Sequence, residues 1–256
     1  MATEATHRMR SFELNEIIQF LPKNAVTLEI GAGDGWQAKQ LSEHCANVYA
    51  VDVEHSHNSA DLHFAVQLYD SQNLPFESHL FDVIYSSNVL EHVVDLEKLQ
   101  SEMSRVLKPG GIAIHCVPSA TWRLWTSLGH FIYIVKLVFK LFYLRFIRAE
   151  QLEATSTRIK NTRWLSLLKL IFISPRHGER GSMLSEIILF SRRHWLTLFA
   201  TSDWALLHYQ PSRIFYTGNE IFGTWISVGA RSKLSRILGS STHIFIFEKK
   251  LHVLTD

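Results

Sequence analysis

Short apolar runs alternate with segments in which apolar residues recur at helical spacing, over residues 11–117 of the chain. The apolar runs predict strands at residues 26–30, 47–52, 62–69, 81–85 and 112–117. Helices are predicted at residues 11–21, 36–45 and 89–107, and Pro109-Gly-Gly ends the last of them. This order of strands and helices is that of βαβ units.

The second half of the chain has a different character. Residues 122–147 are rich in aromatic and aliphatic side chains with interspersed Lys and Arg, and residues 148–170 are more basic. A loop-rich stretch follows at 174–181. The pattern then predicts a helix capped by Ser191 and two further strands, at residues 191–199, 204–209 and 243–247. Residues 210–240 show no pattern that assigns most of them to an element.

Three alternating glycines, Gly31, Gly33 and Gly35, stand between the first strand and the helix that follows it. Glycine accepts positive φ and has no Cβ, so a ligand can lie against bare backbone at the end of the strand. The N–H groups at the start of the helix face the same point. Nucleotide-binding proteins of several kinds use such a turn, although some tight turns bind nothing.

An acidic residue ends the second predicted strand. Asp52 follows Gly31 by 21 positions, close to the spacing at which an acidic side chain meets ribose hydroxyls in a βαβ nucleotide site. A solvated Asp at a strand end is the alternative. Trp36 occupies the position of the third glycine that the dinucleotide version of the turn requires. Its indole argues against a pyrophosphate, and so against a nicotinamide-dependent dehydrogenase, and favours a ligand with adenosine but no phosphate.

Five motifs follow one another between about residue 25 and residue 119: Leu28-Glu-Ile-Gly-Ala-Gly-Asp-Gly35, Val51-Asp52, Asp70 with Leu74-Pro-Phe76, Phe81-Asp-Val-Ile-Tyr-Ser-Ser-Asn-Val-Leu-Glu-His-Val93 and Arg105-Val-Leu-Lys-Pro-Gly-Gly-Ile112. Their conjunction resembles the class I S-adenosylmethionine-dependent methyltransferases, and more narrowly the methyltransferase type 11 group. The resemblance implies an α/β fold with a Rossmann-like, seven-stranded, mostly parallel sheet, helices on both faces and an antiparallel last strand. It also implies S-adenosyl-L-methionine as cofactor.

The strand ends and the resemblance together indicate a cofactor site. Ligands of open α/β sheets bind beyond the carboxyl ends of the strands, where Asn88 and Val89 follow the fourth strand. The resembled family places an acid beside adenine, here Asp70 followed by Ser71, and a turn cap is the alternative role. The residues predicted to bind the cofactor are Glu29, Gly31, Gly33, Gly35, Trp36, Asp52, Val53, Asp70, Ser71, Asn88 and Val89.

Methyl transfer from a sulfonium is an in-line displacement, so an enzyme has to hold the acceptor close and manage one proton. A hydroxyl acceptor benefits from a general base, for which imidazole is suited. His177, next to Gly178 and Glu179 in the loop-rich stretch, is the first candidate. His92 is the second, because the resemblance puts it near cofactor or substrate. Glu91 has the alternative role of stabilising the start of a helix.

The aromatic-basic segment at 122–148 is interpreted as part of substrate access. Its longest uncharged run is 12 residues, short of the roughly 18 that a membrane span needs. The segment predicts a lid or dimer contact, or an amphipathic helix lying in a lipid interface, and both interpretations stay open. The chain is thus divided into a cofactor-binding core (1–119), a helical insertion or lid for substrate or membrane (120–182) and a C-terminal part completing the sheet (183–256).

Composition restricts the partners only slightly. The net charge of +2 and the lack of a long basic face argue against nucleic acid as acceptor. Cys45 and Cys116 form no spaced disulfide or metal framework, and the N-terminus resembles no secretory signal, so we expect a cytoplasmic protein, with membrane association left open. His55, His57 and His63 lack an evident completing ligand, so no metal site is predicted.

The sequence therefore predicts an S-adenosylmethionine-dependent methyltransferase that acts on an oxygen of a sugar, a lipid-linked molecule or another small acceptor. A non-catalytic cofactor-binding or scaffold protein of the same fold is the alternative. The pattern does not identify the acceptor or the oligomeric state.

Overall fold

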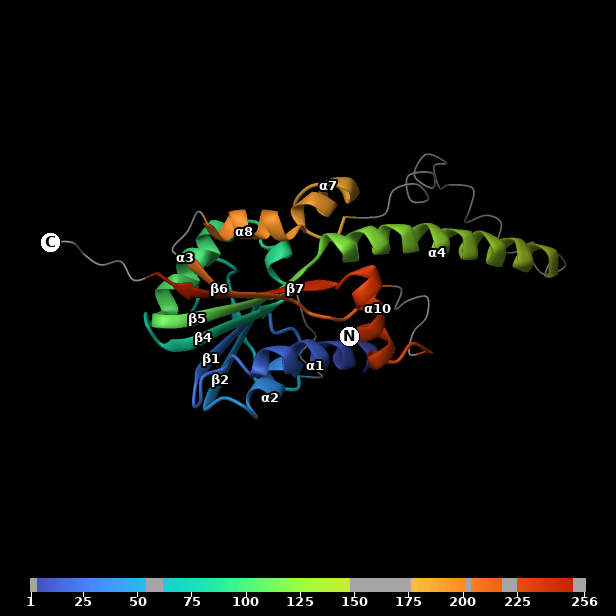
Figure 1. Cartoon of the computed structure of the whole chain (residues 1–256). Helices are drawn as coiled ribbons and strands as arrows, with labels where there is room; N and C mark the ends of the chain where they lie inside the picture. The colour runs from blue at the N-terminus through green and yellow to red at the C-terminus, as the bar shows by residue number, and fades with distance from the viewer. Residues whose placement is uncertain (1–3, 54–61, 148–175, 201–203, 218–224, 251–256) are drawn as a thin grey trace.

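The computed structural model describes residues 4–53, 62–147, 176–200, 204–217 and 225–250. Its strands form one seven-stranded sheet in the order β3-β2-β1-β4-β5-β7-β6 (Figure 1). The strands are β1 (Val26–Ile30), β2 (Asn47–Val53), β3 (Gln67–Tyr69), β4 (Phe81–Ser87), β5 (Leu107–Pro118), β6 (Trp204–Pro211) and β7 (Thr242–Lys249). The first five strands in this order, from β3 through β2, β1 and β4 to β5, pair in parallel. Strand β7 runs antiparallel between β5 and β6. This is the sheet that the sequence predicted.

Helices cover both faces of this sheet. In Figure 1, α1, α2 and α10 lie on one side, and α3, α7 and α8 lie on the other. Their bounds are α1 (Glu4–Ile18), α2 (Trp36–Leu41), α3 (Leu96–Val106), α7 (Met183–Leu189), α8 (Arg192–Ala200) and α10 (Val228–Leu238). On β4, Val83 and Tyr85 belong to the apolar cluster that includes Ile17 of α1, while Ile84 belongs to the cluster that includes Phe199 of α8. Because β4 is covered on both faces, its central residues Val83, Ile84 and Tyr85 form an uninterrupted apolar run.

The predicted continuous helix at 89–107 was wrong, and the difference shapes the site. A short 3₁₀ turn, η2 (Leu90–His92), follows β4, and Val93 is then extended with φ −86° and ψ 119°. Helix α3 begins only after Asp95, whose carboxylate accepts a hydrogen bond from the Lys98 N–H at 3.0 Å. Such an N-cap favours a new helix start over a continuous helix. Glu91 and His92 therefore lie on a turn of their own.

Other boundaries differ more modestly. Helix α1 begins at Glu4, earlier than predicted, because its first turns carry polar residues with no apolar spacing. Strand β3 keeps only the last part of the predicted segment. Helix α10 lies where no element was assigned. Its Ser227 N-cap, which accepts from the Ala230 N–H, and Gly239 after its end are signals that the sequence offered.

One long helix, α4 (Ala120–Ile147), follows β5 and extends away from the sheet (Figure 1). Its first turns are fixed to the body of the protein. Arg123 Nε lies 2.7 Å from the Glu186 carboxylate of α7, and the Trp125 indole donates to the carbonyl of Leu238. Among the described residues, no helix has both the length and the apolar character needed to cross a membrane.

Candidate functional site

The glycine turn lies where the strand order reverses, between β1 and β4. Gly31, Gly33 and Gly35 all have positive φ, at 74°, 58° and 74°. A Cβ on Gly31 would lie 2.2 Å from a methyl of Val89, and one on Gly35 would meet Phe64. At Gly33, by contrast, no described atom lies within 4 Å of an added Cβ. Two of the glycines thus permit close packing, and Gly33 presents open backbone.

Asp52 lies directly against this turn. One carboxylate oxygen accepts a hydrogen bond from the Gly33 N–H, and the other accepts from the Val53 N–H. The side chain is nearly buried, with 6% of the residue exposed. The structure therefore brings Asp52 and the turn together as the spacing predicted, and it contradicts the alternative of a freely solvated strand-end acid.

Glu29, on β1, is a buried acid with an unused oxygen. Its Oε2 has no hydrogen-bond partner among the described residues, and only 1% of the residue is exposed. Burial raises the pKa of Glu29 to about 8, with smaller contributions from the negative charges of Asp52 and Asp34. A buried carboxylate without a counter-ion is unfavourable when ionised. A cation bound near the glycine turn would therefore stabilise the ionised form of Glu29.

Asp70 caps a turn in this structure. Its carboxylate accepts hydrogen bonds from the N–H groups of Gln72 and Asn73 and from the Asn73 amide, and these bonds lower the pKa of Asp70. Ser71 has a left-handed φ of 64° in the same turn. The turn follows β3, which pairs with the end of β2, so it lies at the same edge of the sheet as Asp52. The capping role is observed, and adenine contact remains a prediction.

Helix α1 contributes residues that sequence reasoning missed. Arg10 donates to Ser87 Oγ at 3.0 Å and pairs with Glu13 at 2.9 Å. Asn88, with a left-handed φ of 55°, lies between Ser87, Arg10 and the hydroxyl of Tyr216. The strand end predicted Asn88, but neither Arg10 nor Tyr216 stands in a recognisable local pattern. Their roles arise only from tertiary packing.

A second contact ties α1 to the glycine turn. The ring of His7 stacks on Trp36, with centroids 4.7 Å apart and planes 6° apart. His7 Nε2 lies 3.5 Å from the Asp34 carboxylate, and His63 Nε2 lies 4.0 Å from it. His63 thus has neighbours that the sequence did not indicate, whereas His55 and His57 lie outside the described residues.

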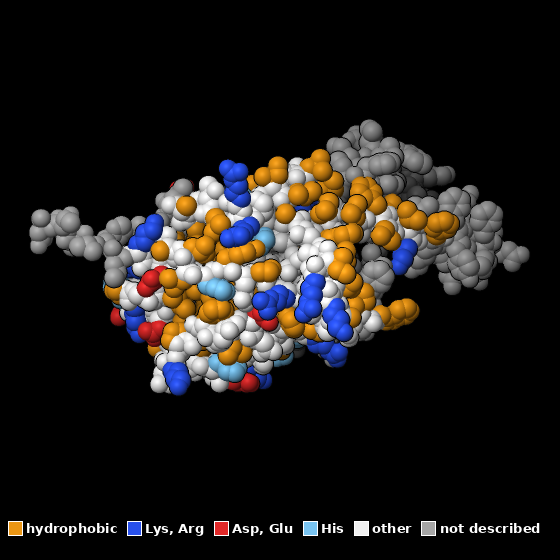
Figure 2. Space-filling model, in the orientation of Figure 1, with side chains coloured by type: hydrophobic (Ala, Val, Ile, Leu, Met, Phe, Trp, Pro, Cys, Tyr) orange, Lys and Arg blue, Asp and Glu red, His pale blue; other side chains and the backbone are white. Residues whose placement is uncertain are grey.

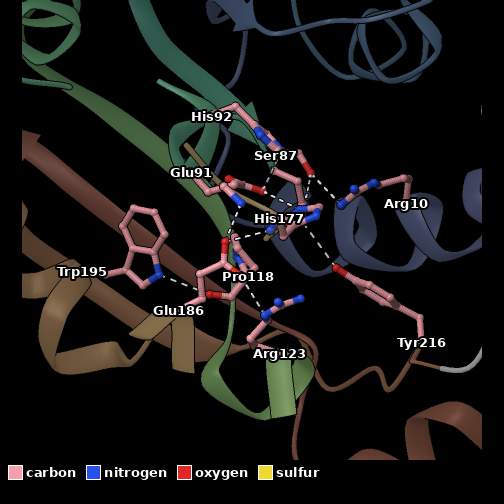
Figure 3. A network of polar contacts seen from close by, with 12 residues as sticks. Arg10, Ser87, Glu91, His92, Pro118, Arg123, His177, Glu186, Trp195 and Tyr216 are labelled. Carbon is pink, nitrogen blue, oxygen red and sulfur yellow. Dashed lines mark hydrogen bonds and ion pairs between the residues drawn. The ribbon is translucent and has the colours of Figure 1, made fainter. Parts of the chain in front are cut away.

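Both histidines predicted to act in catalysis meet at the end of β4 (Figure 3). The rings of His92 and His177 are 4.9 Å apart, although the residues are far apart in sequence. Their Nε2 atoms lie 3.8 and 3.7 Å from Oε1 of Glu91, whose side chain is completely buried. Trp122 of α4 packs against His177 with a centroid distance of 4.5 Å. We refer to Glu91, His92 and His177 as the Glu-His-His cluster.

The loop that carries His177 is held in place by backbone contacts. Glu186 Oε1 accepts from the N–H groups of His177 and Gly178, at 2.7 and 2.8 Å. The Glu179 N–H donates to the carbonyl of Glu91, and a Cβ on Gly178 would lie 2.7 Å from that same oxygen. The close approach requires glycine at 178. Residues 176–179 therefore dock on η2, which explains why His177 reaches the site.

Comparisons with known proteins agree with this geometry. Residues 28–115 match the family described as a methyltransferase domain. The chain is 30% identical over 140 residues to the biotin biosynthesis bifunctional protein of Cellvibrio japonicus, covering 48% of this chain and 27% of that protein. It is 31% identical over 94 residues to phosphoethanolamine N-methyltransferase 2 of Caenorhabditis elegans, covering 33% of this chain and 22% of that protein. The chain thus spans well under half the length of either relative.

A solved structure matches over nearly the whole chain. Geranyl diphosphate C-methyltransferase from Streptomyces coelicolor A3(2), determined with S-adenosyl-L-homocysteine, superposes with a TM-score of 0.53. The match covers 96% of this chain and 82% of that one, at 14% sequence identity. At this identity the likeness concerns the fold alone.

The residues at the turn fit S-adenosylmethionine. Open backbone at Gly33 allows close approach, and the Asp52 carboxylate has acceptor capacity for ribose hydroxyls. The unpaired oxygen of Glu29 suits a ligand that carries positive charge, as this cofactor does on its sulfur and its amino group. Residues 28–115 thus match the methyltransferase domain family, and the strand order and the glycine turn with its acidic partner agree with the fold of a class I S-adenosylmethionine-dependent methyltransferase.

Proposed function

We propose that this protein transfers a methyl group from S-adenosylmethionine to an oxygen of a sugar, a lipid-linked molecule or another small acceptor. The observation that carries the proposal is the Glu-His-His cluster, in which Glu91 and His92 on the turn after β4 meet His177. Val89, just before that turn, packs against Gly31 of the glycine turn. Two imidazoles that converge on one buried carboxylate at the carboxyl edge of the sheet suit the handling of an acceptor proton.

The chain's own residues then have distinct tasks. Bound cofactor supplies an electrophilic methyl group. Asp52 and the glycine turn hold and orient the cofactor, and the acceptor is held on the side of His177 and His92. As the new bond forms, the acceptor hydroxyl loses its proton to the imidazole of His177, with His92 as the second candidate. The buried charge of Glu91 stabilises the imidazolium that results.

The character of the acceptor is suggested by α4. Along this helix, Leu124, Leu128, Phe131, Ile132, Val135 and Phe139 recur at intervals of three and four residues and are 39–71% exposed. This spacing puts them in one stripe on one face of the helix, which we call the α4 stripe. Figure 2 shows hydrophobic side chains gathered along α4 and over α7. An apolar stripe that begins near His177 favours an amphipathic acceptor and a peripheral contact with lipid.

Calorimetric titration with S-adenosylhomocysteine, with NADH titrated in parallel, tests the cofactor part of this proposal. We expect micromolar binding of S-adenosylhomocysteine alone, weakened at least about tenfold in Asp52→Ala, since one lost polar contact in a site has this order of effect. Glycan and lipid-linked acceptors are then screened for methyl transfer. Binding without turnover on any of them would favour the non-catalytic alternative.

The base assignment has its own variant. His177→Ala should bind S-adenosylhomocysteine as the unaltered protein does and lose about 100-fold or more in turnover, the usual contribution of a general base. His44→Ala, at an exposed position after α2, is the matched control and should retain full turnover. Unchanged turnover in His177→Ala would refute the assignment.

A further inference from the structure

The unusual feature of the Glu-His-His cluster is its carboxylate. Neither oxygen of Glu91 has a hydrogen-bond partner among the described residues, and its side chain is completely buried. Removing an ionised carboxylate from water without compensation is costly, so a group of this kind normally pairs with a cation or coordinates a metal. A positive charge is therefore expected beside Glu91.

The nearby arginines are already engaged. Figure 3 shows Arg10 to the right of the cluster and Arg123 below it. Arg10 pairs with Glu13 at 2.9 Å, and Arg123 pairs with Glu186 at 2.7 Å. Each guanidinium therefore has a carboxylate of its own, and neither forms an ion pair with Glu91 among the described residues. This leaves His92 and His177 as its charged or coordinating neighbours.

The distances in the cluster suit an ion between the three side chains better than direct hydrogen bonds. His92 Nε2 and His177 Nε2 lie 3.8 and 3.7 Å from Glu91 Oε1, beyond the range of N–H···O hydrogen bonds. All three potential ligand atoms lie within 4.8 Å of one another. Ligand atoms about 2.0–2.2 Å from a four-coordinate zinc ion are separated from one another by roughly 3.4 Å, so the cluster needs only a small contraction.

We propose that Glu91, His92 and His177 form a binding site for a divalent transition-metal cation of the zinc class. Two imidazoles and one carboxylate supply three ligands and leave a fourth position for water or substrate, as in catalytic zinc sites. His92 and His177 are 44% and 35% exposed, so the cation can be reached from solvent on that side. Glu186 supports the site indirectly, because it fixes the backbone of His177.

The consequence for catalysis rests on the proposed function. The acceptor hydroxyl would occupy the fourth position, where the charge of the cation lowers its pKa. With the cation bound, the hydroxyl would release its proton to solvent in place of His177, and the oxygen lone pair would form the new bond to the methyl carbon. The carbon–sulfur bond breaks, and its electron pair stays on sulfur. His177 would then act as a ligand when the cation is bound, and as a base only when the cation is absent.

Zinc binding is tested on the full chain, first treated with a chelator and then titrated calorimetrically with Zn²⁺. Co²⁺ serves as a spectroscopic probe, because its visible absorption reports a four-coordinate site with nitrogen ligands. We expect one equivalent at micromolar affinity or tighter. Glu91→Gln, His92→Asn and His177→Asn should each weaken binding at least about tenfold, as even outer-shell changes at metal sites have that effect. Circular dichroism verifies folding, and the two histidine variants change partly exposed side chains.

His63→Asn is the matched control, since His63 belongs to the other group of potential ligands, with His7 and Asp34. It should bind Zn²⁺ as the unaltered protein does. Absence of a saturable equivalent, or equal affinity in His92→Asn and His177→Asn, would overturn the site. Such a result leaves S-adenosylhomocysteine binding and methyl transfer untouched, so failure of the metal site is distinguishable from failure of the proposed function.

Discussion

Glu29 links the cofactor site to the protonation state of the protein. Burial, followed by the charges of Asp52 and Asp34, raises the pKa of Glu29 from 4.5 to about 8. Between these pH values the folded protein holds a proton that the unfolded chain has released. The free energy of unfolding attributable to Glu29 therefore falls as the pH rises from about 4.5 to about 8. Glu29→Gln should flatten the dependence of the free energy of unfolding on pH in this range.

Cofactor binding should reverse the protonation of Glu29. A ligand with a sulfonium and an ammonium favours the ionised carboxylate, so binding of S-adenosylmethionine near pH 7 should release close to one proton. Calorimetry in two buffers with different ionisation enthalpies measures the number released. Glu29→Gln, which keeps the shape of the side chain, should bind with a proton release near zero. An equal release in both proteins would place the titrating group elsewhere.

At the scale of single residues, the part of the site that could be predicted is the part encoded locally. Gly31, Gly33, Gly35 and Asp52 follow from spacing along one βαβ unit, and the structure brings them together. Their neighbours from distant segments leave no such trace. Arg10 and Tyr216 reach the end of β4 only because α1 and the chain before α10 pack there. The spacing of apolar residues along the sequence does not predict these contacts.

At the scale of elements, the position of His177 depends on a clamp between α4 and α7. Arg123 and Glu186 form a buried ion pair with side chains 2% and 0% exposed. The other oxygen of Glu186 holds the N–H groups of His177 and Gly178. Glu186→Leu should destabilise the protein by roughly 3–5 kcal/mol, since it removes the carboxylate of a buried ion pair with Arg123. It should also lower turnover at least about tenfold because the His177 loop is released.

A double variant separates these two effects. Arg123→Met combined with Glu186→Leu removes both charges, so most of the lost stability should return in chemical denaturation. Turnover should stay low, because the N–H groups of His177 and Gly178 still lack their acceptor. Recovery of turnover along with stability would mean that Glu186 matters for folding alone.

The sequence predicted α4 as an aromatic-basic element, but a clamp between segments that lie on either side of residues 148–175 has no local signature.

For the whole molecule, the sheet was predictable because every strand except β3 contains a short run of apolar residues, although the strand itself can be longer, as β5 is. The resemblance to a known family supplied the antiparallel direction of the last strand, which periodicity alone does not determine, and the structure places β7 between β5 and β6. The break between η2 and α3 was missed for a related reason. Apolar spacing continues across Val93 and Leu96, and only the Asp95 cap decides in favour of two elements.

The α4 stripe makes a prediction about where this molecule works. Helix α4 has 28 residues, about 42 Å of helix at 1.5 Å per residue, and Lys136 lies exposed on its surface. An exposed apolar stripe with basic residues favours binding to anionic phospholipid over neutral lipid. The protein should therefore cosediment with vesicles containing phosphatidylserine, and Ile132→Glu with Val135→Glu should lower the affinity at least about tenfold, because burying an apolar side chain contributes roughly 1.5–3 kcal/mol. Ile237→Glu, on the exposed surface of α10, is the matched control and should bind vesicles normally. If the double variant instead converts a dimer to a monomer in sedimentation analysis and leaves vesicle binding unchanged, then the stripe is a subunit contact and the lipid assignment is wrong.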